Sequence, residues 1–153
     1  MAHILLIEDN PIDARLMQRM IDGRTTWIDD GEKALWYLRC LESGGVDDPP
    51  SLVLLDMNLP KYDGLEVLEQ FRSSAALRHL PVFLLSSAPA YEIAGEAESR
   101  NLRADAYIEK PRGLSEFEDL AARVREAARL SFSEARTAAA QRRRLQALRS
   151  QRF

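Results

Sequence analysis

The sequence is poor in cysteine and has no long hydrophobic run. Cys40 is the one cysteine among 153 residues, so the chain cannot form an internal disulfide. No stretch approaches the ~18 apolar residues of a membrane-spanning helix, and the first apolar run meets Glu8 and Asp9 too early for a signal peptide. We therefore expect a soluble cytoplasmic protein with no membrane contact. A domain of this length buries roughly 70% of its unfolded surface, so its core can stabilise it without metals or disulfides.

Acidic residues are scarce at the C-terminal end. Residues 131–153 hold six arginines and one glutamate, a local balance of +5, whereas the whole chain carries −3; residues 1–130 therefore carry −8. An acidic body argues against nucleic-acid binding there, and the question stays open only for the basic extension. We expect two parts, a globular domain over residues 1–130 and a basic, helical extension over residues 131–153.

Glycine and proline, which interrupt helices, do not occur after Gly113. Residues 131–150 are mainly strong helix formers, so the last helix should continue or restart through them, and twenty such residues span about 30 Å. A thin stripe favours a second copy of the chain as partner, giving a homodimer through the C-terminal helices; it consists of Leu130, Ala138, Leu145 and Leu148. The alternatives are a partly frayed extension and a contact with a kinase, nucleic acid or another anionic partner. The extension is too short for a DNA-binding domain.

Apolar runs and helical periodicities alternate along residues 1–130, which is typical of a parallel sheet with helices on both faces. The predicted strands are residues 3–7, 25–28, 52–55, 80–85 and 104–108. The predicted helices begin at Pro11, Gly31, Gly64, residue 90 and Leu114, and Ile12, Leu16 and Met20 form the predicted buried stripe of the first one. We expect the larger aromatic residues in the core or at its rim: Trp27, Trp36, Phe71, Phe83 and Phe117. The fold class is therefore α/β, with five β-α units.

Polar residues follow the predicted strands. Ligands of an open parallel sheet bind beyond the carboxyl ends of its strands, where the sequence places Glu8, Asp9, Asp56, Ser86 and Lys110. Carboxylates this close raise one another's pKa unless a proton or a cation relieves them, and oxygen ligands suit Mg²⁺. We interpret the cluster as a phosphoryl site in which Asp56 forms an acyl phosphate, while Lys110 and Ser86 contact phosphate oxygens. The alternative is a set of ordinary loop acids and a loop lysine.

Four segments, in this order and spacing, resemble the receiver domain of two-component response regulators over residues 3–130. They are Ile-Glu-Asp-Asn at 7–10, Leu-Leu-Asp-Met-Asn-Leu-Pro at 54–60 with Asp63-Gly64, Leu-Ser-Ser-Ala at 85–88, and Tyr-Ile-Glu-Lys-Pro at 107–111. The resemblance implies a doubly wound, five-stranded parallel sheet of order 2-1-3-4-5, flavodoxin-like, with an extended C-terminal helix.

The resemblance also implies roles for individual residues. Asp56 is the expected phosphoacceptor. Mg²⁺, or Mn²⁺ in its place, is expected on Asp9, Asp56 and the backbone carbonyl of Asn58, with Glu8 acting through a coordinated water. Lys110 and Ser86 are expected to contact the phosphoryl group, and Tyr107 to pack inward behind Ser86 when the protein is phosphorylated. The auxiliary positions of the site are Ser87, Ala88 and Pro111.

The implied function is that of a single-domain response regulator, which takes a phosphoryl group from a histidine kinase and changes its affinity for a downstream protein. Such a protein catalyses only its own phosphorylation and dephosphorylation. One competing hypothesis is a phosphatase or phosphotransferase of the haloacid dehalogenase type; those enzymes carry an acid-base Asp two residues after the nucleophile, where this chain has Asn58. Another is a receiver-like scaffold that is never phosphorylated.

Several departures from the common receiver pattern indicate a narrower resemblance. The segment between the first helix and the second strand is short, whereas the second helix and the loop through residues 43–51 are long. Together with the motif over residues 58–64, these features resemble stand-alone receivers paired with phytochrome-type histidine kinases. A kinase of that type is the expected partner.

Overall fold

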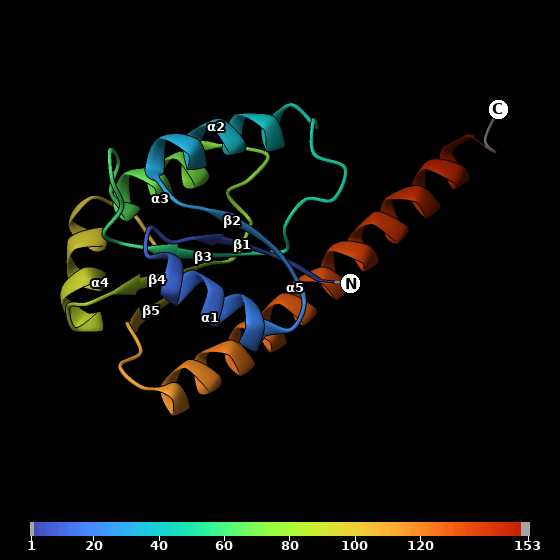
Figure 1. Cartoon of the computed structure of the whole chain (residues 1–153). Helices are drawn as coiled ribbons and strands as arrows, with labels where there is room; N and C mark the ends of the chain where they lie inside the picture. The colour runs from blue at the N-terminus through green and yellow to red at the C-terminus, as the bar shows by residue number, and fades with distance from the viewer. Residues whose placement is uncertain (1, 151–153) are drawn as a thin grey trace.

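The structure, a computed structural model, describes residues 2–150, in which five strands and five helices alternate (Figure 1). The strands are β1 (His3–Ile7), β2 (Arg24–Ile28), β3 (Leu52–Asp56), β4 (Val82–Ser86) and β5 (Ala106–Glu109). The helices are α1 (Pro11–Ile21), α2 (Gly31–Glu42), α3 (Gly64–Ser73), α4 (Ala90–Ser99) and α5 (Leu114–Ser150). All neighbouring strands are parallel and their order is β2-β1-β3-β4-β5, which confirms the predicted fold.

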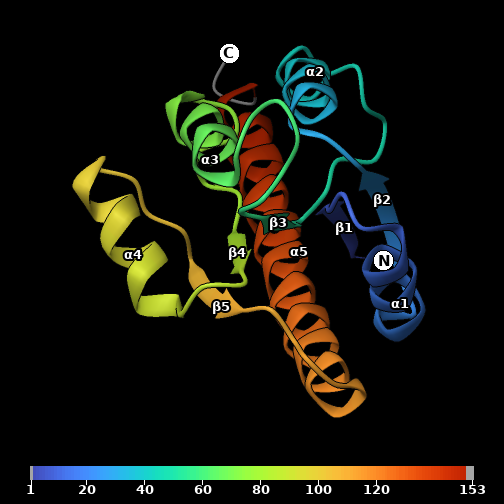
Figure 2. The same ribbon diagram turned by 60° about the vertical axis from the view of Figure 1, so that its left-hand side comes forward.

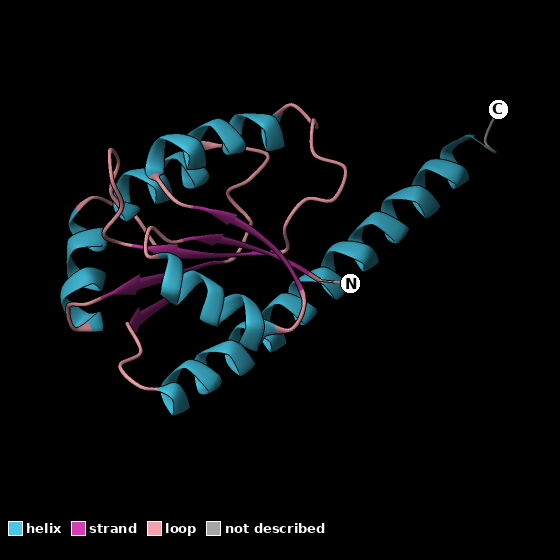
Figure 3. Ribbon diagram, in the orientation of Figure 1, coloured by secondary structure: helices cyan, strands magenta, loops and turns pink. Residues whose placement is uncertain are grey.

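The sheet separates two hydrophobic cores. Helices α2, α3 and α4 cover one face, and α1 and α5 cover the other (Figures 2 and 3). Successive residues of a strand point to opposite faces, so Leu5 and Ile7 enter the first core while Ile4 and Leu6 enter the second. Strands β1, β3 and β4 are buried on both faces, which explains their continuous apolar sequences.

Side-chain caps begin the three helices that follow β1, β2 and β3. The Asn10 side chain accepts hydrogen bonds from the backbone N–H groups of Ile12 and Asp13. Asp30 caps α2 in the same way, and Asp63 caps α3. Caps of this kind satisfy the free N–H groups of a first turn. They also fix the loops that leave the carboxyl edge of the sheet, where the predicted site lies.

Two sequence predictions about buried side chains are wrong. The α1 stripe is displaced: Ile12 is 75% exposed, and the helix buries Ala14, Met17 and Ile21 instead. Trp36 is 65% exposed, because α2 faces the sheet with residues 34 and 38, and a side chain midway between them points to the opposite side of the helix. A large aromatic side chain favours burial, but the place of Trp36 on the outer side of α2 keeps it exposed to solvent.

Helix α5 continues without a break through residue 130 and ends, in the described part of the chain, at Ser150. Its first half packs against α1 and the sheet through Leu120, Ala121, Val124 and Ala128. The Ser51 hydroxyl donates a hydrogen bond to the Ala128 carbonyl where the helix leaves the body. The remainder, residues 129–150, projects beyond the sheet for about 33 Å (Figure 1). The last three residues of the predicted extension, 151–153, lie outside the described residues.

Among residues 2–150, none of the helices combines the length and the apolar character needed to cross a membrane.

Candidate functional site

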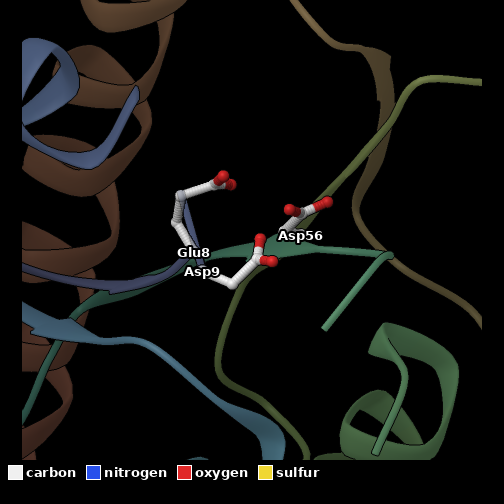
Figure 4. A group of neighbouring side chains, drawn as sticks. All are labelled: Glu8, Asp9 and Asp56. Atoms are coloured by element: carbon white, nitrogen blue, oxygen red, sulfur yellow. The ribbon is translucent and has the colours of Figure 1, made fainter. Parts of the chain in front are cut away.

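Three carboxylates meet at the carboxyl edge of the sheet. Glu8 and Asp9 follow β1, and Asp56 is the last residue of β3. One oxygen of each carboxylate lies within 4.8 Å of the others (Figure 4). Glu8 and Asp56 are buried, at 3% and 1% exposure, while Asp9 is exposed. The cluster therefore has an enclosed side and a side open to solvent.

Lys110 bridges the two buried carboxylates from the loop after β5. Its Nζ donates hydrogen bonds to Glu8 Oε1 at 3.0 Å and to Asp56 Oδ2 at 2.9 Å. Its backbone N–H donates to the Ser86 carbonyl at 2.7 Å, which holds the lysine beside the end of β4. Burial works to lower the pKa of Lys110, but the hydrogen bonds to Asp56 and Glu8 outweigh it and raise the pKa above its ordinary value. The lysine is therefore charged at neutral pH.

Repulsion and burial within the cluster act most clearly on the pKa of Glu8. Burial and then the neighbouring Asp56 charge raise its pKa to about 7, although the hydrogen bond from Lys110 acts in the opposite direction. Glu8 therefore binds a proton more readily near neutral pH than an ordinary glutamate does. The repulsion between these carboxylates is reduced by the positive charge of Lys110 and by the raised pKa of Glu8, which favours its neutral form.

The backbone around Asp56 fixes the direction of its carboxylate. The Asn58 N–H donates to Asp56 Oδ1 at 3.1 Å, so each carboxylate oxygen has a donor. Met57 continues the β3–β4 pairing by donating to the Leu85 carbonyl at 2.7 Å, and Gly64 donates to the Met57 carbonyl at 2.8 Å. The Asp56 side chain thus stands on a segment bonded to both the sheet and the start of α3.

The other predicted residues lie around this centre at different depths. Ser86 ends β4 and is buried, and its Oγ accepts a hydrogen bond from the Ala88 N–H at 3.0 Å. Ser87 is exposed, whereas Ala88 and Pro111 are half-buried. The structure thus brings Ser86 to the strand end beside Asp56 and leaves Ser87 facing solvent.

Tyr107 lies farther from the carboxylates. It is half-buried on β5 opposite Leu84, and its hydroxyl accepts a hydrogen bond from the Ala104 N–H at 3.0 Å. Ala104 precedes β5, so this bond ties the ring to the amino end of the strand. The structure therefore presents Tyr107 with its hydroxyl away from the phosphoacceptor edge.

Two residues at the site escaped the sequence analysis. Asp13, in the first turn of α1, places Oδ2 3.8 Å from Lys110 Nζ. Asp13 could have been noticed from the sequence, because it lies three residues after the Asn10 cap and therefore in the first helical turn beyond the end of β1. For Trp27 the sequence predicts only a place in the core or at its rim, yet its indole N–H donates to the Glu8 carbonyl at 2.7 Å. No sequence pattern indicates that bond, because it depends on the β1–β2 register.

The donor set fits a small hard cation. The cluster offers carboxylate oxygens, and exposed Asp9 leaves an open side where waters or phosphate oxygens can complete a coordination shell. Mg²⁺ typically takes one or two protein carboxylates and retains several waters. An opposing divalent charge would also relieve the repulsion that raises the pKa of Glu8. The residues therefore fit the predicted metal.

A doubly wound sheet with two acids just after β1, one at the end of β3 and a lysine after β5 is the arrangement expected of a receiver. The sequence model of the response regulator receiver domain matches residues 4–125, and the chain belongs to this family. As a class, such domains serve in signalling rather than in the turnover of a metabolite.

The individual relatives narrow this assignment. The probable methanogenesis regulatory protein FilR2 of Methanothrix harundinacea is 43% identical over 128 residues, which cover 80% of this chain and 79% of the relative. The response regulator Rcp1 of Synechocystis is 33% identical over 119 residues, covering 74% and 80% of the two chains.

Solved structures extend the comparison. The phosphorylated cyanobacterial phytochrome response regulator RcpA superposes with a TM-score of 0.72 at 32% identity, over 83% of this chain and 93% of that one. The Mn²⁺-bound form of Rcp1 gives a TM-score of 0.68 at 29% identity, over 79% and 89%. The resemblance to stand-alone phytochrome response regulators is thereby confirmed.

Proposed function

We propose that the protein is a response regulator that accepts a phosphoryl group from a sensor histidine kinase onto Asp56, in a reaction that requires Mg²⁺. The observation that carries the proposal is the bridge from Lys110 to Asp56 and Glu8 within a three-carboxylate cluster. An Asp56 oxygen would attack the phosphorus atom in line; the P–N bond of the phosphohistidine breaks, and its electron pair returns to the imidazole. No general base is needed, because in-line geometry and the charge of Mg²⁺ supply what the transfer requires.

Each residue of the site has a part in this reaction. Mg²⁺, held by Asp9, Asp56 and the Asn58 carbonyl with Glu8 acting through a water, would offset negative charge on the equatorial phosphoryl oxygens. Lys110 would exchange its bond to Asp56 for one to a phosphoryl oxygen. The Ser86 hydroxyl would donate to another.

These new bonds would drive the conformational change. A shift from 1:99 to 99:1 between two states needs about 5.5 kcal/mol, and two charge-assisted hydrogen bonds supply roughly 1.5–3 kcal/mol each. Movement of Ser86 toward the phosphate frees space on β4, into which Tyr107 would turn after releasing Ala104. The altered surface would then change the affinity for a downstream protein.

Asn58 argues against the phosphatase alternative. An aspartyl-phosphate phosphatase needs an acid-base group two residues after the nucleophile, and an amide cannot exchange protons in that role. The scaffold alternative is disfavoured because Lys110, Ser86 and all three carboxylates are present. More than stoichiometric hydrolysis of a phosphate ester would support the phosphatase instead.

The test uses acetyl phosphate and Mg²⁺ with the full-length protein and an Asp56→Asn variant. We expect the wild-type mass to rise by one labile phosphate and the variant mass to stay unchanged, as measured by intact-protein mass spectrometry. Circular dichroism of the variant controls for its fold. Equal phosphorylation of both proteins would place the phosphate elsewhere, and none on either would favour the scaffold hypothesis.

The partner we propose is a histidine kinase of the phytochrome type, in the cytoplasm. Support comes from the likeness to RcpA and Rcp1 and from the long α2 and α2–β3 segments. FilR2 is named as a probable methanogenesis regulatory protein, so its likeness to this chain would favour a stimulus other than light. Phosphotransfer from a purified phytochrome-type kinase to the wild type, absent in Asp56→Asn, tests this pairing.

We expect the Mg²⁺ affinity to depend on pH through Glu8. The pKa of Glu8 is about 7, so at pH 6 a bound cation must displace a proton that is absent at pH 8. Competition of this kind weakens binding by about tenfold at pH 6. Calorimetric titration of Mg²⁺ at the two pH values measures the effect. A Glu8→Gln variant should lose this pH dependence, and equal wild-type affinities at both pH values would contradict the prediction.

We also propose that residues 1–130 form the receiver proper and residues 131–153 a dimerisation element. Along the described part of that extension, Leu145 and Leu148 are each 59% exposed, which favours burial against a second copy. A projecting helix of this length gains stability mainly by packing.

The oligomeric proposal is tested by placing acid on the stripe. We expect a Leu145→Asp, Leu148→Asp double variant to elute as a monomer in size-exclusion chromatography with light scattering, where the wild type elutes as a dimer. Leu114→Asp is the matched control, since Leu114 is 61% exposed at the other end of the same helix. A monomeric wild type would leave the frayed-extension or anionic-partner alternatives, and duplex DNA binding with a steep salt dependence would favour the latter.

A further inference from the structure

Trp27 holds the segment that carries the first two carboxylates of the site. Its indole N–H donates to the Glu8 carbonyl at 2.7 Å, and the Glu8 N–H donates to the Ile28 carbonyl at 3.0 Å. Both polar groups of the Glu8 backbone are therefore bonded to β2 at the point where β1 ends. We infer that Trp27 is a positioning residue for the metal-binding loop, an inference that rests on the proposed Mg²⁺-dependent function.

Strand pairing and core packing fix the position of the Trp27 indole. Trp27 lies opposite Leu6 in the β1–β2 register, and its ring packs against the core between the sheet and helices α1 and α5. From there its indole N–H reaches Glu8, which lies two residues after the pairing partner Leu6 and just past the end of β1. A phenylalanine or leucine could fill the same space, but neither can donate a hydrogen bond to a carbonyl oxygen.

The hydrogen bond from Trp27 to the Glu8 carbonyl affects the metal site because Asp9, the next residue, is an exposed candidate ligand. Asp9 is open to solvent, so the placement of its carboxylate depends on the backbone that precedes it. Glu8, which Lys110 and the Asn10 N–H hold from the side-chain end, shares that backbone. Groups that orient metal ligands from behind commonly control metal affinity. Releasing the Glu8 carbonyl should therefore loosen both acids relative to Asp56.

The two tryptophans of the chain make a matched pair for the test. Trp27→Phe removes the donor and retains an aromatic ring, whereas Trp36→Phe makes the same chemical change at a residue that is 65% exposed. With Mg²⁺ alone as the probe in calorimetric titrations of the full-length protein, we expect the dissociation constant of Trp27→Phe to rise about fivefold, the equivalent of one ordinary hydrogen bond. That of Trp36→Phe should match the wild type.

Urea unfolding separates positioning from mere structural support. If Trp27→Phe lowers the unfolding midpoint but binds Mg²⁺ as tightly as the wild type, the inference is overturned while the proposed function stands. If the wild type itself fails to bind Mg²⁺, both are overturned.

A second measurement leaves Trp27 intact. In the Trp36→Phe variant Trp27 is the sole remaining indole, and its ¹H–¹⁵N resonance should shift as Mg²⁺ is added. An unmoved resonance at saturating Mg²⁺ would overturn the coupling between Trp27 and the metal loop, even if Trp27→Phe does not fold.

Discussion

Replacing Lys110 with methionine should destabilise the metal-free protein by about 2–3 kcal/mol at pH 8.5, because two buried carboxylates then lose their shared cation. We expect a smaller loss of folding stability than for a fully buried ion pair, because the Lys110 side chain is 22% exposed. Methionine keeps most of the volume of the lysine stem, so packing changes little. Urea unfolding in the presence of a chelator measures the effect.

The loss of stability in Lys110→Met should shrink at pH 6. In the wild type, Glu8 has a raised pKa of about 7, so its contribution to folding stability is complete below pH 4.5 and is lost as the pH rises through 7. Lys110 lowers that pKa, and removing it raises the pKa further. Glu8 is then protonated at pH 6 and no longer repels Asp56. An equal loss at both pH values would contradict this assignment of charge.

Mg²⁺ and a surface lysine provide the controls for Lys110→Met. Added Mg²⁺ should restore part of the stability at pH 8.5, since it supplies the missing positive charge. Lys33→Met is the matched variant: Lys33 Nζ lies 2.7 Å from Asp29 Oδ1, but both side chains are largely exposed. Exposed pairs contribute little because water screens them. A Lys33→Met loss as large as that of Lys110→Met would show that burial is not the cause.

The cluster could be predicted from sequence because parallel topology gathers strand ends. Glu8, Asp56 and Lys110 are separated by dozens of residues, yet each follows a short apolar run, and a doubly wound sheet brings such positions to one edge. The strand order itself followed from the family resemblance. Nothing beyond element type and order was needed to place these three residues together.

The finer contacts could not be predicted in this way. The bridge from Lys110 to both Glu8 and Asp56 depends on side-chain distances of about 3 Å, which spacing along the chain does not determine. The Trp27 bond requires the β1–β2 register. The misplacement of Ile12 and Trp36 has another origin: apolar residues outnumber the positions that α1 and α2 bury, so helical phase must be known before a stripe is assigned.

Replacing Gly64 with alanine should destabilise the protein by about 2–3 kcal/mol and impair phosphorylation of Asp56. A Cβ at Gly64 would lie 2.7 Å from the Asp56 carbonyl oxygen and 2.7 Å from the Met57 Cα. Both are backbone atoms, so no side-chain rotation relieves the clash. The start of α3 and the end of β3 must move apart, which strains the bond from the Gly64 N–H to the Met57 carbonyl and displaces the phosphoacceptor.

Gly95→Ala is the matched control for this close approach. Gly95 is exposed within α4, and a Cβ there meets nothing within 4 Å. In a helix interior alanine is more favourable than glycine by about 0.5–1 kcal/mol, so this variant should be more stable than the wild type and phosphorylated normally. Urea unfolding and the acetyl phosphate assay compare the two variants directly. If Gly64→Ala is as stable as the wild type and gains phosphate at the same rate, β3 and α3 tolerate separation, and the position of Asp56 does not depend on their contact.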